Sequence, residues 1–64
     1  MDHELGGSAR SRRLRKRAYQ VRQVSINRCD DLEGWRISRL LRDAATTAQA
    51  DEAERQLGIW ERAL

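Results

Sequence analysis

The chain has 64 residues, no proline, one cysteine, one histidine and a formal net charge of +3. A chain of this length buries only about 60% of the surface that its unfolded form exposes, so small proteins usually gain stability from a disulfide, a metal or a second subunit. One cysteine and one histidine exclude an internal disulfide and a closed zinc site, so we expect no cofactor and a homodimer. Since no apolar stretch approaches the roughly 20 residues that span a bilayer and no signal-peptide pattern is present, we expect a cytoplasmic protein, or a nuclear one in a eukaryote.

The charge is distributed unevenly along the chain. Residues 1–29 carry eight Lys and Arg against two acids, whereas residues 30–64 carry five Arg against eight acids. The densest block, RSRRLRKR at residues 10–17, has six basic residues in eight positions. Such a block repels itself and remains solvated unless a polyanion neutralises it, so nucleic acid is the leading candidate partner.

The first predicted elements are a flexible tail at residues 1–9 and a basic helical arm at residues 10–28. The tail contains Gly6, Gly7 and Ser8 and has too few apolar side chains to offset the entropy of ordering a backbone. Ser8 or Ser11 can cap the helix. A narrow apolar strip at helical spacing supports it, formed by Leu14, Ala18, Val21 and Ser25.

The basic helix carries the predicted nucleic-acid contacts. Arginine can contact phosphate with two parallel hydrogen bonds, and tyrosine can stack on a base. The predicted contact residues are Arg10, Arg12, Arg13, Arg15, Lys16, Arg17, Tyr19 and Arg22. The run formed by Ala9, Arg12, Arg13, Lys16, Arg17 and Ala18 resembles the arginine-rich helices of phage antitermination proteins and lentiviral RNA-export proteins. That resemblance implies a hairpin RNA as ligand, so RNA is favoured over DNA.

A second helix is predicted to begin at Asp30, which forms a capping box with Glu33. Its core face follows the spacing i, i+3, i+4, i+7, i+8, i+11 and comprises Ile37, Leu40, Leu41, Ala44, Ala45 and Ala48. Leu32 and Trp35 fall on another side of the helix, with Arg39 nearby. These three residues are therefore predicted to contact a partner, and the alternative for Trp35 is that the first helix covers it.

A break and a third helix are predicted after this face. Thr46 with Gln49, or Asp51 with Glu54, can cap the new helix. Its apolar stripe is Ala50, Ala53, Leu57, Trp60 and Leu64. Gly58 interrupts the helix as a local weak point. Residues 30–64 then form an antiparallel helical hairpin, so the predicted fold is all-α, with three short helices completed by dimerisation.

Two alternatives follow from the same residues. Residues 23–27 alternate polar and apolar side chains, which resembles the strand of a ribbon-helix-helix repressor. That resemblance implies a strand in the DNA major groove, with Gln23, Ser25 and Asn27 facing base edges. In function, the alternative is a protein-interaction adaptor or inhibitor whose basic helix docks an acidic protein surface.

Because the sequence lacks a catalytic pairing and a phosphate-binding glycine loop, we expect no enzymatic activity. Cys29 is expected to be a partly buried, unreactive thiol.

Overall fold

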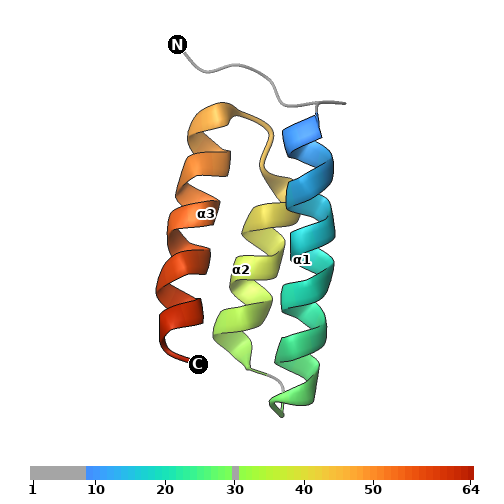
Figure 1. Ribbon diagram of the computed structural model, residues 1–64, viewed down its shortest axis with the longest axis vertical. Helices are drawn as coiled ribbons and strands as arrows, with labels where there is room; N and C mark the ends of the chain where they lie inside the picture. The colour runs from blue at the N-terminus through green and yellow to red at the C-terminus, as the bar shows by residue number, and fades with distance from the viewer. Residues whose placement is uncertain (1–8, 30) are drawn as a thin grey trace.

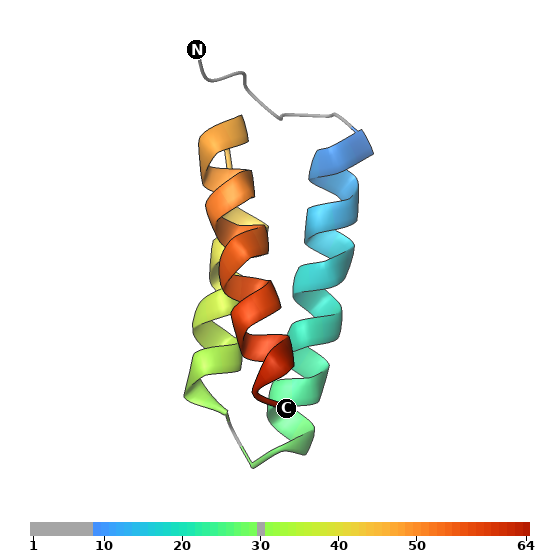
Figure 2. The same ribbon diagram turned by 60° about the vertical axis from the view of Figure 1, so that its left-hand side comes forward.

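The computed structural model describes residues 9–29 and 31–64, so the predicted tail at residues 1–8 lies outside the described residues. Three helices form the structure: α1 (Ala9–Asn27), α2 (Leu32–Asp43) and α3 (Thr47–Arg62). They lie side by side in a bundle about 37 Å long, and α2 runs in the opposite direction to α1 and α3 (Figures 1 and 2). The predicted all-helical class with three helices is confirmed. The ribbon-helix-helix alternative is wrong, because residues 23–27 form the last turns of α1.

The apolar strip predicted for the first helix is the face that α1 buries. Leu14, Ala18 and Val21 belong to one hydrophobic core with residues of α2 and α3. Ser25 is fully buried at the end of this strip, where its hydroxyl donates a hydrogen bond to the carbonyl of Val21 at 2.9 Å. A buried serine that bonds its own helix leaves no unsatisfied polar group. The strip therefore packs α1 along its length onto the other two helices.

A tight turn joins α1 to α2. Cys29 adopts the left-handed backbone conformation, with φ 59°, and its side chain is exposed. The prediction of a partly buried thiol is therefore wrong: the left-handed turn that reverses the chain places Cys29 on its outside. The cap of α2 is Asp31, whose carboxylate accepts hydrogen bonds from the backbone N–H groups of Glu33 and Gly34. This cap lies one residue after the predicted Asp30, which is outside the described residues.

The core face of α2 is shorter than predicted. Ile37 and Leu41 are buried, while Leu40 and Ala44 pack partly against the core. Because α2 ends at Asp43 and Ala44 has an extended backbone, with ψ 118°, the helical spacing stops there. Ala45 and Ala48, predicted on the same face, are exposed.

Thr46 caps α3, which confirms one of the two predicted caps. Its hydroxyl accepts a hydrogen bond from the backbone N–H of Gln49 at 3.2 Å, and the Gln49 side chain accepts one from the N–H of Ala45 at 2.8 Å. The predicted stripe is buried in its first four members, Ala50, Ala53, Leu57 and Trp60. Leu64 is half exposed because α3 ends at Arg62, so its predicted place in the stripe is wrong.

Residues of all three helices meet at Gly34. A Cβ atom on this glycine would lie 1.8 Å from the hydroxyl oxygen of Ser25 on α1 and 3.0 Å from the indole of Trp60 on α3. Only a residue without a side chain fits there.

Among the described residues, no helix is both long enough and apolar enough to cross a membrane.

Candidate nucleic-acid interface

The seven basic residues of α1 fall into three groups around the helix. At 100° per residue, Arg12, Arg13 and Lys16 point within about 60° of the direction opposite the buried strip. Arg10 and Arg17 lie on the flank that faces α3, as their ion pairs show. The remaining two, Arg15 and Arg22, lie on the opposite flank, toward α2. The cations of one sequence block therefore have three different surroundings.

The α3 flank is neutralised within the protein. Arg10 donates hydrogen bonds to Asp51 at 2.6 Å and to Glu54 at 2.8 Å, and Arg17 pairs with Glu61. Since α1 and α3 run in the same direction, the start of α3 lies beside the start of α1 (Figure 2). The hydrogen bond to Asp51, followed by the one to Glu54, raises the pKa of Arg10. These pairs join two helices whose parallel dipoles otherwise repel each other.

Among the described residues, the outward group has no such partner. Arg12, Arg13 and Lys16 are exposed, and no carboxylate of residues 9–29 or 31–64 lies within 4.0 Å of their charged groups. Tyr19, one turn beyond them, is 62% exposed. This surface, which we call the α1 outer face, consists of Arg12, Arg13, Lys16 and Tyr19. Three uncompensated cations and an exposed ring are the chemistry of a phosphate-binding surface.

The flank of α1 that faces α2 contacts the second helix through Arg22. The Arg22 guanidinium lies over the ring of Trp35 on α2, 5.5 Å from its centroid, which is within the range of a cation–π contact. Arg15 is seven residues before Arg22, and Arg42 is seven residues after Trp35. Because α1 and α2 are antiparallel, this register brings Arg15 and Arg42 to the same level of the bundle. Arg42 is paired with Asp43, whereas Arg15, within the described part of the chain, donates a hydrogen bond to Ser11 at 3.3 Å.

The three predicted partner-contact residues lie together on the outer side of α2. They border a hollow of about 250 Å³ that is lined by Leu32, Trp35, Arg36 and Arg39. Leu32 is 79% exposed, and Trp35 is half-buried beneath Arg22. Sequence reasoning missed Arg36 as a member of this site. The spacing i, i+3, i+4, i+7 that begins at Leu32 was the signal that could have found it.

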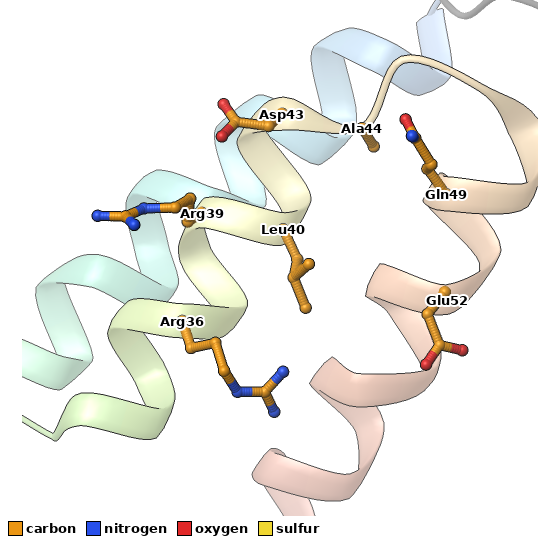
Figure 3. Close-up of a pocket in the computed structure, with 7 residues that line it drawn as sticks. All are labelled: Arg36, Arg39, Leu40, Asp43, Ala44, Gln49 and Glu52. Atoms are coloured by element: carbon orange, nitrogen blue, oxygen red, sulfur yellow. The ribbon is translucent and has the colours of Figure 1, made fainter.

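A larger hollow lies between α2 and α3 (Figure 3). It measures about 350 Å³, and Leu40 points into it from α2. Two carboxylates, those of Asp43 and Glu52, line this hollow. Hydrogen bonds from Arg55, then from Gln56, lower the pKa of Glu52 to about 2, so it is charged at neutral pH. Arg36 and Arg39 line the same hollow, so its lining carries charged groups of both signs.

Within residues 9–29 and 31–64, no group of three or more His, Cys, Asp or Glu residues could hold a metal ion. No protein family, curated protein or solved structure matches this chain.

Proposed function

We propose that this protein is a non-catalytic nucleic-acid-binding protein that holds phosphates on the α1 outer face, with RNA favoured over DNA. The observation that supports it most strongly is the absence of a carboxylate partner, within the described residues, for Arg12, Arg13 and Lys16. Cations that the fold has not paired are available to displace the counterions of a polyanion. Arg15 and Arg22 extend the same positive surface toward α2.

The ion pairs on the α3 flank support the proposal in a second way. Asp51, Glu54 and Glu61 would repel a phosphate backbone that approaches α1, but two of these three charges are balanced by Arg10 and Arg17. These two arginines therefore act in the proposal as internal counterions, whereas the outer face contacts the ligand. Because α1 is packed onto α2 and α3, it presents one face and not its whole circumference. This geometry favours phosphate contact over deep insertion into a groove.

A binding assay with a charge-matched control tests the proposal. The double variant Arg12→Ala, Arg13→Ala is compared with Arg55→Ala, Arg62→Ala, which has the same net charge but leaves α1 intact. At 0.1 M salt each lost phosphate contact weakens duplex binding by roughly eightfold, so we expect roughly sixtyfold weaker binding for the α1 variant. The α3 control keeps wild-type affinity to within a few-fold. Equal affinities of the wild type and the α1 variant would remove the outer face from the mechanism.

The same protein preparations distinguish nucleic-acid binding from the adaptor alternative. An acidic protein partner would remain bound after nuclease treatment, whereas a nucleic-acid ligand would be lost. The predicted homodimer is kept as a proposal because Leu32 and Ile26 expose apolar side chains near the turn between α1 and α2. Sedimentation equilibrium at micromolar concentration tests it, and a single 7.5 kDa species would contradict it.

A further inference from the structure

The hollow on the outer side of α2 differs from the one between α2 and α3 in its charge. Arg36 and Arg39 line both hollows, but no carboxylate lines the smaller one, whereas Asp43 and Glu52 line the larger one. The lining of the smaller hollow combines one aromatic ring, one exposed leucine and two guanidinium groups, those of Trp35, Leu32, Arg36 and Arg39. An aromatic ring beside cations fits a ligand that is itself planar and attached to an anion. A nucleobase on its phosphate backbone has this chemistry.

The charges around the hollow can be assigned one by one. Arg36 is engaged by Glu33 through two hydrogen bonds of 2.8 Å, so its charge is already balanced. Arg39 is exposed, and no carboxylate of the described residues lies within 4.0 Å of it. On the other side, Arg22 of α1 covers the Trp35 ring. The positive charge that remains for a ligand therefore comes from Arg39 and Arg22.

The position of Trp35 connects this hollow to the α1 outer face. Through Arg22, its ring touches the helix that carries the phosphate-binding cations. Trp35 is half-buried, with the Arg22 guanidinium 5.5 Å from its ring centroid, and it also lines the hollow, so its side chain is restrained before any ligand arrives. A restrained ring loses little conformational entropy when a base stacks on it. Leu32, 79% exposed in the first turn of α2, offers an apolar contact at the edge of the same hollow.

We infer that this hollow binds an unpaired base of the nucleic acid whose phosphates lie on α1, with the base packed against Trp35 and Leu32 and its phosphate near Arg39. The inference rests on the proposed function and narrows its ligand to a strand with a bulged or unstacked nucleotide. A regular duplex would contact the α1 outer face only.

The experiment compares two RNA probes: a duplex of about 20 base pairs and the same duplex with one bulged adenosine at its centre. Base–aromatic stacking is worth roughly 1–3 kcal/mol, so we expect the bulged probe to bind wild-type protein roughly 5- to 150-fold more tightly. Trp35→Leu should bind both probes with the affinity that the wild type has for the regular duplex. Arg12→Ala, Arg13→Ala should weaken binding to both probes by the same factor.

A bulge also widens the neighbouring groove, so the variants decide whether the preference comes from this hollow. A bulge preference that persists in Trp35→Leu, or equal wild-type affinity for the two probes, would overturn the inference while leaving the proposed function intact. Failure of wild-type protein to bind either probe would contradict the proposed function itself. Circular dichroism shows whether Trp35→Leu folds. If it does not, Leu32→Ala and Arg39→Ala, at exposed side chains, replace it, and each should reduce the bulge preference at least threefold.

Discussion

Asp31 and Trp60 are joined by a hydrogen bond of 2.9 Å from the indole N–H to carboxylate oxygen Oδ2. The other oxygen, Oδ1, accepts from the backbone N–H groups of Glu33 and Gly34 and so caps α2. One carboxylate therefore fixes the start of α2 and anchors the end of α3 to it. Both carboxylate oxygens of Asp31 therefore already accept hydrogen bonds.

Substitutions of Asp31 separate these two roles. Asparagine is as good an N-cap as aspartate, but its amide has one acceptor oxygen in place of two. We therefore expect Asp31→Asn to lower the free energy of unfolding, and Asp31→Ala, which removes both acceptors, to lower it further. Urea unfolding followed by circular dichroism measures the order. Trp60→Phe is the control that removes the donor and keeps the cap. An Asp31→Asn protein as stable as the wild type would contradict the shared role.

Acid should destabilise the bundle because the pKa values of the Asp31 and Glu52 carboxyl groups are lowered in the folded protein. The hydrogen bond from Trp60, followed by the backbone N–H groups of Gly34 and Glu33, lowers the pKa of Asp31 below its ordinary 3.8. Arg55 and Gln56 lower the pKa of Glu52 from 4.5 to about 2. A carboxyl whose folded-state pKa is lowered stabilises the protein above its unfolded-state pKa, and that stabilisation is lost as pH falls through the folded-state value.

We therefore expect stability that is level above about pH 5 and falls steadily toward pH 2. Urea midpoints at a series of pH values measure this dependence. Glu52→Gln should show a shallower fall, because its side chain does not titrate. A wild-type midpoint that stays constant between pH 5 and pH 2 would contradict these ionisations.

Two glycines provide an internally matched test of the packing. Gly34→Ala must displace the buried Ser25 hydroxyl, which is 1.8 Å from the site of the new Cβ, and the Trp60 indole. We expect a net loss of about 1–3 kcal/mol, since overpacking outweighs the gain in helix propensity. At Gly58 nothing lies within 4 Å of the new Cβ, so Gly58→Ala should stabilise the protein by up to about 1 kcal/mol. Thermal unfolding measures both, and an unchanged or raised midpoint for Gly34→Ala would contradict the close approach.

The pairs between α1 and α3 should contribute to stability in a salt-dependent way. We expect the double variant Arg10→Gln, Arg17→Gln to lower the melting temperature at low salt, because it removes the ion pairs of these cations with Asp51, Glu54 and Glu61. At 1 M salt, where the Debye length is about 3 Å, the difference from wild type should shrink. Arg12→Ala, at an exposed position with no carboxylate partner among the described residues, is the control and should melt as the wild type does at both salt concentrations. A difference that is independent of salt would contradict an electrostatic origin.

Local patterns of the sequence located most of the fold. The buried strip of α1, the Thr46 cap and the burial of Trp60 each depend on residues within a few positions of one another, where spacing and capping chemistry are informative. The cap of α2 was placed one residue early because Asp30 and Asp31 are adjacent and either can serve. Ala45 and Ala48 continue the helical spacing of α2 beyond its end at Asp43, because no helix-breaking residue marks that end.

The site was less predictable because its decisive contacts join distant segments. That Arg10 and Arg17 are paired depends on α1 and α3 lying parallel, 41 to 44 residues apart in sequence. Composition could identify a basic block, but it could not divide that block into paired and unpaired cations. The need for glycine at position 34 likewise comes from α1 and α3, and nothing in α2 alone indicates it.

The salt dependence of nucleic-acid binding tests the role of the α1 outer face most directly. For wild-type protein on duplex DNA, log affinity should fall linearly with log salt, with a slope of about −0.9 for each contacted phosphate. We expect Arg12→Ala, Arg13→Ala, Lys16→Ala to make this slope shallower by about 2.7, whereas Arg55→Ala, Arg62→Ala keeps the wild-type slope. A triple variant that binds with the slope and affinity of the wild type would show that phosphates are held elsewhere.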